Sequence, residues 1–459
     1  MVHNKHHHDS HPRSTIILAS AILIAASLPA AMQANAETQL TLLHSFTEET
    51  KIKGPLSPHG DYLYGVADKG GSANAGYIGR LDPSTGSWVP AYEFSTETKV
   101  KGGLVPVDHR LWFVCEKGGA AGYGYIGAFD PADSTVIVLA DFAAETKPKT
   151  APTALDDQGW YFLTDKGGSL NLGALMRFHP AAGLAVIASF DQETGHKFEA
   201  PPVAFQGRIW YAAREGGDLS QMSGKGAGVI GTLDLQQGRV ESRLVLNAAN
   251  HGAKIRALLP VGDKLYYAAE EGGDLTLNSG KGYGGIGCYD PQTGTARWIL
   301  VCDGPINGAK PKALARHHRA QLYYLCAEGG STGYGLIGRI VNNNPELVAT
   351  LDASTGAKAD ALTVWQNRLF VTTELGAAHW FGGIATLPLS ASVAPTLSWH
   401  HQQGRLQLRW NPPENWQLET APTPTGPWSP VETAEATSGS LSVEPTDPAR
   451  FFRLRPIAP

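Results

Sequence analysis

The feature that most constrains the fold is a lysine-centred segment that recurs seven times along the 459-residue chain. The first three copies read ETKIKGPL from residue 49, ETKVKGGL from residue 97 and ETKPKTAP from residue 145. The later copies read GHKFEAPP, GAKIRALL, GAKPKALA and GAKADALT, and neighbouring lysines are 48–57 residues apart. Repetition at such a period indicates one structural unit built seven times.

Each copy holds four short apolar or aromatic runs of the kind that forms β-strands. In the first copy they cover 54–59, 61–68, 76–82 and 87–94, and a DPSTG turn joins the last two. The proline and glycine of this turn suit a tight hairpin. Four antiparallel strands in about 50 residues is the period of a β-propeller blade, whereas strand-based solenoid repeats are shorter, at about 20–30 residues.

The two ends of the array predict how it closes. An apolar run at 40–46 resembles a fourth strand but precedes the first copy, and the seventh copy ends after its third run at 382–388. Pairing these two removes exposed sheet edges, which would otherwise promote aggregation. We therefore predict an all-β fold whose main domain, residues 37–391, is a seven-bladed β-propeller closed by its N-terminal strand.

The flanking segments are predicted to be separate from the propeller. Residues 1–36 have the features of a signal peptide, with basic residues before a mostly apolar run and small residues at 34–36. No later segment holds 18 uninterrupted apolar residues, so no transmembrane segment is expected after signal cleavage. We expect a secreted or cell-surface protein, periplasmic or extracellular. Residues 392–459 contain five strand-like runs, which predict a small fibronectin-like β-sandwich as an accessory module.

Charge and cysteine content exclude some classes of partner and bond. Removing residues 1–36 takes away two basic residues and one acid, so the formal net charge changes from −5 to −6. This mild charge, without a basic stripe, argues against nucleic acid. Cys288 and Cys302 are out of register on neighbouring strands, and Cys115 and Cys326 hold the same place in distant copies. We therefore expect four buried free thiols. We also expect a monomer with no cofactor and no metal.

The first copy resembles a known family of repeats. Residues 42–90 combine a run ending in LLHSF, the aromatic DYLYG run, paired glycines and the DPSTG turn. This pattern is similar to the GloVer tandem repeats of secreted bacterial proteins, and the resemblance covers about residues 40–390. It implies an extracellular propeller-like repeat and supplies no established catalytic residues. The WQLE, WSPV and FFRLR sequences near the C-terminus resemble modules associated with surface retention or export.

The recurring lysines and a set of recurring acids are predicted to share one face of the propeller. The loop that enters the first strand of a blade and the loop after its second strand lie on the same face. The second loop carries DKGG, EKGG or a related sequence, whose glycines are expected to supply positive φ beside a close backbone approach. The lysines are Lys51, Lys99, Lys147, Lys197, Lys254, Lys310 and Lys358. The acids are Asp68, Glu116, Asp165, Glu215, Glu271, Glu328 and Glu374.

Two interpretations of these charges stay open. The favoured one is structural, with each lysine paired to an acid in a collar around the channel mouth, because seven unpaired ammonium groups would repel one another. The other is a charged funnel that orients an anionic ligand such as an acidic sugar. Seven equivalent groups do not make a catalytic centre, which needs an asymmetric set of residues.

Asymmetry does occur in the same loops. Copies four and five carry longer insertions at 216–231 and 272–287, whose SGKG sequence lacks the spacing and the helix of a phosphate-binding loop. Aromatic residues also recur beside the glycines. Exposed, they would stack on sugar rings, although we favour burial against the next blade. These aromatic residues are Tyr123, Tyr283, Tyr334, Trp380 and Phe381.

Three classes of function follow from these patterns. The leading one is an exported, non-catalytic binding propeller for a poly- or oligosaccharide or another envelope polymer, with an envelope protein as a less favoured ligand. The second is a polysaccharide lyase or hydrolase with its site at the same face, near copies four to six. The third is an envelope scaffold or adhesion protein. A solvent-facing aromatic row would favour sugar binding, a carboxylate pair would favour an enzyme, and fully paired charges would favour a scaffold.

Overall fold

The computed structural model describes most of the main domain and parts of the C-terminal segment. In the main domain it describes residues 39–155, 159–234, 237–317, 321–341 and 343–389. In the C-terminal segment it describes residues 396–402, 405–411, 416–421, 427–431, 440–443 and 451–456. The predicted signal peptide at 1–36 lies outside the described residues. Within them, no helix is long and apolar enough to cross a membrane.

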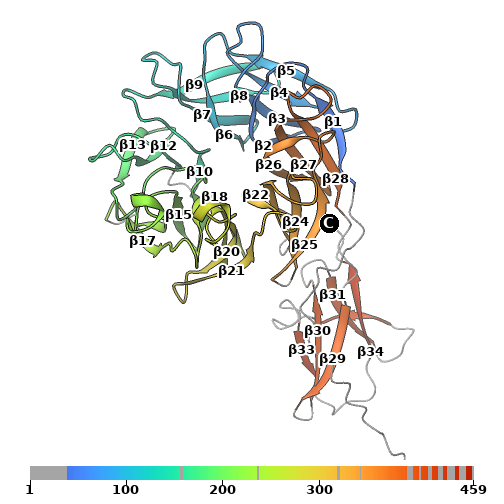
Figure 1. Cartoon of the computed structure of the whole chain (residues 1–459). Helices are drawn as coiled ribbons and strands as arrows, with labels where there is room; N and C mark the ends of the chain where they lie inside the picture. Colours follow the sequence, from blue (N-terminus) through green and yellow to red (C-terminus); the bar gives the residue numbers. More distant parts are fainter. Residues whose placement is uncertain are drawn as a thin grey trace, which may run out of the picture. The chain divides into compact units, whose positions relative to one another are not determined.

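The main domain is all-β and consists of four-stranded antiparallel sheets, each built from one sequence copy except the last, which also takes β1 (Figure 1). The first three sheets contain β2 (Ile52–His59), β3 (Tyr62–Ala67), β4 (Tyr77–Leu81), β5 (Trp88–Glu93); β6 (Val100–Val107), β7 (Arg110–Cys115), β8 (Tyr125–Asp130), β9 (Thr135–Asp141); and β10 (Thr153–Ala154), β11 (Trp160–Leu163), β12 (Ala174–His179), β13 (Gly183–Ser189).

The remaining sheets follow the same order of strands. They contain β14 (Val203–Phe205), β15 (Arg208–Ala213), β16 (Val229–Asp234), β17 (Arg239–Val245); β18 (Ala253–Val261), β19 (Lys264–Glu271), β20 (Gly285–Asp290), β21 (Thr295–Val301); β22 (Ala309–His317), β23 (Gln321–Glu328), β24 (Leu336–Val341), β25 (Asn344–Thr350); and β26 (Ala357–Trp365), β27 (Arg368–Leu375), β28 (Gly383–Pro388) with β1 (Thr41–Ser45).

The N-terminal strand completes the last of these sheets. β1 pairs antiparallel with β28, with Thr41 opposite Thr386 and Ser45 opposite Gly383. The predicted pairing of the run at 40–46 with the incomplete seventh copy is therefore confirmed. It covers an edge of β28 that could otherwise pair with another chain.

The first strands of the sheets meet around a common centre, which makes the fold propeller-like. Contacts run from β10 through β14, β18 and β22 to β26, and β2 contacts both β26 and β6. The hydroxyl of Ser57 donates to the Leu104 carbonyl oxygen at 2.5 Å, and that of Thr363 donates to the Leu56 carbonyl oxygen at 2.9 Å. The second of these bonds joins the last copy to the first.

A recurring glycine in the third strand makes room for an aromatic ring from the second strand. Gly287 in β20 lies against Tyr267, and Gly338 in β24 lies against Tyr324. A Cβ atom at either glycine would lie 2.1 Å from the ring carbon Cζ, far inside van der Waals contact. This packing explains why third strands such as GIGCYD keep a central glycine.

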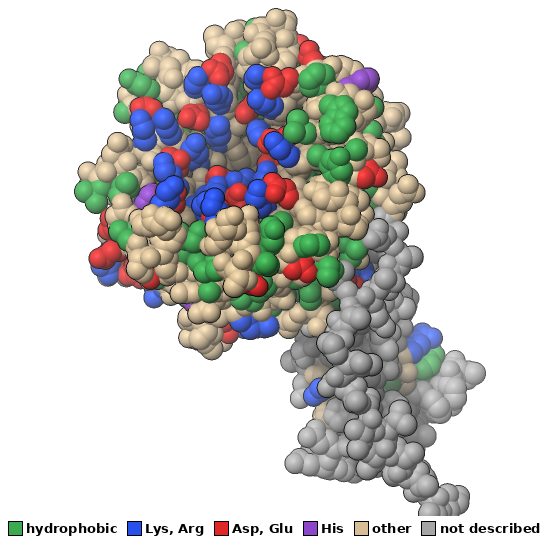
Figure 2. All heavy atoms as spheres, viewed as in Figure 1, with side chains coloured by type: hydrophobic (Ala, Val, Ile, Leu, Met, Phe, Trp, Pro, Cys, Tyr) green, Lys and Arg blue, Asp and Glu red, His purple; other side chains and the backbone are tan. Residues whose placement is uncertain are grey.

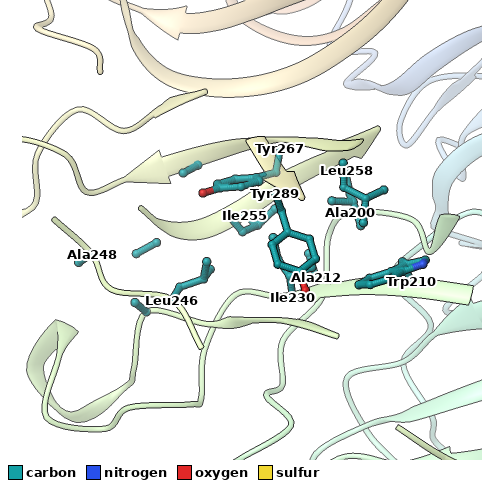
Figure 3. Packing of buried hydrophobic residues seen from close by; sticks show 14 residues of the cluster. Ala200, Trp210, Ala212, Ile230, Leu246, Ala248, Ile255, Leu258, Tyr267 and Tyr289 are labelled. Carbon is teal, nitrogen blue, oxygen red and sulfur yellow. The ribbon is translucent and has the colours of Figure 1, made fainter. Parts of the chain in front are cut away.

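Apolar side chains fill the space between neighbouring sheets. Trp210 and Ile230 of the fourth sheet pack with Tyr267 and Tyr289 of the fifth (Figure 3). The ring centroids of Trp210 and Tyr289 are 5.8 Å apart. Burial of these side chains holds one sheet against the next. All four cysteines are buried and free, as predicted.

The C-terminal segment forms two three-stranded sheets. One contains β29 (Thr396–Gln402), β30 (Arg405–Asn411) and β33 (Ser440–Val443), and the other contains β31 (Trp416–Ala421), β32 (Ser429–Pro430) and β34 (Phe451–Pro456). The described residues of this segment hold six strands, one more than the five runs expected, and β32 spans only two residues. Arg453 binds the Glu419 carboxylate at 2.7 Å, and its guanidinium carbon lies 4.3 Å from the Trp428 ring centroid.

Candidate binding site

A cavity opens where the first strands meet, and residues from all seven copies line it. Its volume is about 510 Å³. Figure 2 shows lysine, arginine and acidic side chains gathered around the hollow centre of this face. The charged residues of the cavity wall are Lys53, Asp68, Lys101, Lys149, Glu199, Arg256, Lys312, Asp360 and Glu374.

Most of this charge comes from a sequence position that was not predicted to form a site. It is the residue two places after each recurring lysine, in KIK, KVK, KPK, KFE, KIR, KPK and KAD. The residues at this position are Lys53, Lys101, Lys149, Glu199, Arg256, Lys312 and Asp360. The repeated spacing was present in the sequence and could have identified them. The two acids among the cations give the wall the asymmetry that a selective site needs.

The seven recurring lysines have a backbone role of their own. All have φ between 49° and 62°, in the left-handed region that is uncommon outside glycine. The carbonyl oxygen of Lys51 accepts a hydrogen bond from the Asp68 N–H at 3.2 Å, and that of Lys99 accepts one from the Glu116 N–H at 3.0 Å. The predicted proximity of lysine and acid is therefore produced by backbone hydrogen bonds.

In the first three copies the lysine side chain binds a different acid from the predicted one. The ammonium groups of Lys51 and Lys69 lie 2.8 Å and 2.7 Å from the carboxylate of Glu49. Hydrogen bonds from both lower the pKa of Glu49 to about 2. The equivalent groups are Glu97 with Lys99 and Lys117, and Glu145 with Lys147 and Lys166.

Within the described ranges, the predicted side-chain pairing occurs in copies five and six. Lys254 binds Glu271 and Lys310 binds Glu328, each at 2.7 Å. Two recurring lysines, Lys197 and Lys358, form no ion pair with the residues that the structure describes. A continuous collar is therefore wrong, because in copies one to three a glutamate two residues upstream is the nearer partner for the ammonium group.

Three of the predicted acids instead hold cations of the cavity wall. The pairs are Lys53 with Glu374 in close contact, Lys101 with Glu116 at 3.2 Å, and Lys149 with Asp165 at 3.7 Å. The Lys53 pair joins the first copy to the seventh. Glu215 lies 4.0 Å from the imidazole Nδ1 of His196, so this contact is an ion pair when the histidine is protonated.

Acidic and basic side chains are unevenly distributed around the cavity wall. On one side, Arg214 and Arg256 both contact Glu199, and Arg214 also binds Glu270 at 2.8 Å. From copies two and three, Lys101 and Lys149 are the charged lining residues, and no acid of those copies is among the described residues that line the cavity. Each of these two lysines is ion-paired, with Glu116 or Asp165, but neither acid lines the cavity.

Two aspartates of the wall have opposite electrostatic environments. Oδ1 of Asp68 is buried without a hydrogen-bond partner in the described part of the chain, and burial raises the pKa of Asp68. Burial would also raise the pKa of Asp360, but Lys312, Lys53 and the N–H of Gly54 outweigh it and lower this pKa. The Gly54 nitrogen lies 3.0 Å from Oδ2 of Asp360.

Asp68→Asn is expected to stabilise the protein at about pH 7 by about 1 kcal/mol, and Asp360→Asn to destabilise it by about 2 kcal/mol. Ionised Asp68 costs stability above its raised pKa, and the cost disappears as the pH falls below the ordinary aspartate value. Ionised Asp360 contributes stability above the ordinary value, and this is lost as the pH falls through its lowered pKa. Urea unfolding at about pH 7 and about pH 3 measures both effects. Changes of the same sign at neutral pH would contradict these environments.

The paired glycines have the predicted backbone conformation. Gly70 and Gly71 have φ values of 86° and 74°, and the glycine pairs of copies two to six also have positive φ. The Gly76 N–H donates to the Gly70 carbonyl oxygen at 3.2 Å and so closes the loop. In the seventh copy Ala377 replaces the second glycine at a φ of 59°.

The recurring aromatic residues divide into an exposed and a packed set. Tyr123, Trp380 and Phe381 are 42%, 58% and 40% exposed. Tyr283 and Tyr334 are half-buried against apolar clusters between sheets. The favoured burial is therefore wrong for three of the five. The loop folds back on itself after the glycines in both sets, with Gly118 bridged to Tyr123 and Gly329 bridged to Tyr334.

The two long insertions have similar conformations but do not contribute to the cavity. They contain the 3-10 helices η2 (Met222–Gly224) and η3 (Asn278–Gly280), with Ser223 and Ser279 at φ values of 57° and 54°. Both insertions are described in full, and none of their residues lines the cavity. The asymmetry of the site comes from its wall instead.

Comparison with known proteins supports the fold. No family model matches the chain, and no curated protein matches it in sequence. The extracellular domain of a hybrid two-component system from B. thetaiotaomicron matches with a TM-score of 0.51 and 10% identity, over 89% of this chain and 54% of that one. This chain therefore spans about half the length of that protein.

Two other matching structures are oligogalacturonate lyases. One, in complex with manganese, has a TM-score of 0.47 and 12% identity, over 77% of this chain and 98% of that one. The other, from Vibrio parahaemolyticus, has a TM-score of 0.48 and 9% identity, over 78% and 95%. Identities this low say nothing about what this chain binds or catalyses.

Proposed function

We propose that this protein is an exported, non-catalytic binding propeller that takes an anionic carbohydrate, or another acidic envelope polymer, at the mouth of the cavity. The observation that carries the proposal is the pair Lys101 and Lys149 of adjacent copies, which line the cavity while their ion-pair partners Glu116 and Asp165 do not. A carboxylate or sulfate on a sugar chain would form charge-assisted hydrogen bonds with both ammonium groups.

Exposed aromatic rings support a sugar as the ligand. Tyr123 lies on the loop that begins with Glu116, and Trp380 and Phe381 lie on the loop that begins with Glu374. Aromatic planes suit the C–H faces of sugar rings. Exposed rings together with the cations of the cavity wall favour an acidic sugar over an acidic protein segment.

The proposed architecture is a single seven-bladed propeller over residues 37–391. The four-stranded sheets and the closure by β1 support it, and we extend the resemblance to GloVer repeats to the whole ring. The two C-terminal sheets support a fibronectin-like sandwich over residues 392–459 that serves surface retention or export. A signal peptide at 1–36 would make the mature protein secreted or surface-bound, and we propose that it is a monomer.

A second candidate is an acidic-polysaccharide lyase or hydrolase using the same cavity. Asp68, Asp360 and Glu374 all line it. The raised pKa of Asp68 suits a proton donor, and the lowered pKa of Asp360 suits a carboxylate that stays ionised. These residues belong to copies one and seven, whereas the enzyme alternative was expected near copies four to six. A scaffold stays a third candidate, because the cations of the cavity wall are ion-paired.

Binding of the mature chain to a panel of oligosaccharides tests this proposal. Uronic-acid oligomers are compared with neutral glucose oligomers of equal length by isothermal titration calorimetry. We expect the charged oligomers to bind, with affinity about tenfold weaker in about 0.5 M salt than in about 0.02 M salt. Equal affinity for both kinds, or no binding of either, would overturn the proposal. Shortened or unsaturated products after long incubation would establish catalysis instead.

A further inference from the structure

Two buried thiols from neighbouring sheets lie in contact. Cys302 directly follows β21 of the fifth sheet, and Cys326 lies in β23 of the sixth. Their Sγ atoms are 3.9 Å apart, and the two residues are 1% and 0% exposed. The pair was not predicted, because the repeat alignment matched Cys326 with Cys115 and compared Cys302 with Cys288.

The two sulfurs are surrounded by apolar side chains and one backbone carbonyl oxygen. They lie in an apolar cluster with Leu300 and Leu336. The Asn307 carbonyl oxygen is 3.7 Å from each Sγ, the distance of a weak S–H hydrogen bond. Structural zinc sites use four ligands, and no group of three or more His, Cys, Asp or Glu residues suited to a metal occurs among the described residues.

A tight turn directly after Cys302 holds its sulfur against the next sheet. The Asp303 N–H donates to the Asn307 side-chain oxygen at 2.7 Å, and the Gly304 N–H donates to the Gly308 carbonyl oxygen at 3.0 Å. A Cβ atom at Gly308 would lie 2.7 Å from the sulfur of Cys326. Glycine at this position therefore leaves the space in which the two sulfurs meet.

We infer that Cys302 and Cys326 form a disulfide when the chain meets a thiol-oxidising environment. An S–S bond is about 2.05 Å long, so sulfurs now 3.9 Å apart need to approach by roughly 1.8 Å. Small rotations about the two Cα–Cβ bonds can supply that movement. The bond would join the fifth and sixth sheets, which share no strand ladder.

The oxidant required is another disulfide, either a small molecule or a protein. The Cys302 thiolate attacks one sulfur of the oxidant, forms a mixed disulfide and releases the other sulfur as a thiolate that takes up a proton. The Cys326 thiolate then attacks the Cys302 sulfur and releases the second thiol. The chain loses two protons and two electrons, and one oxidant disulfide becomes two thiols.

Burial raises the pKa of Cys326 well above its ordinary value, so exchange in the folded protein is slow and needs local opening of the turn.

Thiol counting on the full mature chain tests the inference. After incubation with oxidised glutathione and its removal, we expect two titratable thiols under denaturing conditions instead of four, and a peptide that joins Cys302 to Cys326. Cys115→Ser should keep this bond and one free thiol, and Cys302→Ser should form no internal bond. Four free thiols at equilibrium, or a bond to another cysteine, would overturn the inference.

Thermal unfolding gives a second readout. The two cysteines are 24 residues apart, and reducing a bond across such a loop is expected to lower Tm by on the order of 5 °C. Wild type and Cys115→Ser should show this shift on adding reductant, and Cys302→Ser should not. An equal shift in Cys302→Ser would contradict the inference. If Cys302→Ser does not fold, thiol counting on the wild type still decides.

Discussion

Gly287→Ala is expected to lower the free energy of unfolding by about 3 kcal/mol. The new methyl group would lie 2.1 Å from Cζ of Tyr267, whose ring is fully buried between the fourth and fifth sheets. Gly287 is not among the glycines with positive φ, so the cost is steric and not conformational. To admit the methyl group, the ring would have to push against its buried neighbours Tyr289 and Ile255.

Urea unfolding followed by tryptophan fluorescence measures this effect, with Gly262→Asn as a control. Gly262 has nothing within 4 Å of a Cβ position, and its φ of 61° is one that asparagine tolerates. The control should change stability by less than about 1 kcal/mol. If Gly287→Ala were as stable as wild type, the aromatic ring would not rest on the glycine in solution.

The fold could be predicted because its signals are local and repeated. The expected strand at 54–59 became β2 at Ile52–His59, and the expected pairing of 40–46 became the β1–β28 ladder. A few neighbouring residues determine the alternation of a strand and the conformation of a glycine- and proline-containing turn. Seven repetitions of the same pattern remove most of the ambiguity of any single copy. In the C-terminal segment, where no pattern repeats, the described strands outnumber the expected runs by one.

The charge pairing could not be predicted, because it depends on backbone geometry that the pattern does not reveal. The left-handed conformation of Lys51 was not apparent from a residue type that seldom adopts it. Its nearest acid is Glu49, two residues upstream, and not Asp68 across the sheet. The charges of the cavity wall come mainly from Lys53 and its equivalents instead.

The exposure of the aromatic residues could not be predicted from the sequence either. Tyr123 and Tyr334 hold the same place in their copies, yet the first is exposed and the second packs against a cluster between sheets. The difference arises from contacts with the neighbouring sheet, which a repeat alignment does not contain. The Cys302 and Cys326 contact was missed for the same reason.

Lys101→Gln/Lys149→Gln is expected to weaken binding of a uronic-acid oligomer by about 100-fold. Each substitution removes one ammonium group from the cavity wall and keeps most of the side-chain length, so the shape of the cavity changes little. Glu116 and Asp165 lose their cationic partners and become two additional repulsive charges for an anionic ligand. The aromatic rings on the loops remain, so a residual, salt-insensitive affinity for the sugar chain is expected.

The decisive measurement is isothermal titration calorimetry of one uronic-acid oligomer against three proteins: wild type, Lys101→Gln/Lys149→Gln and Arg239→Gln/Lys264→Gln. The last variant loses the same charge from Arg239 and Lys264, at the starts of β17 and β19, on the opposite side of the sheets from the cavity loops. If the cavity is the binding site, the cavity variant loses about 100-fold in affinity and the control stays within about threefold of wild type. Equal losses in the two variants, or an unchanged affinity in the cavity variant, would contradict a binding site in the cavity.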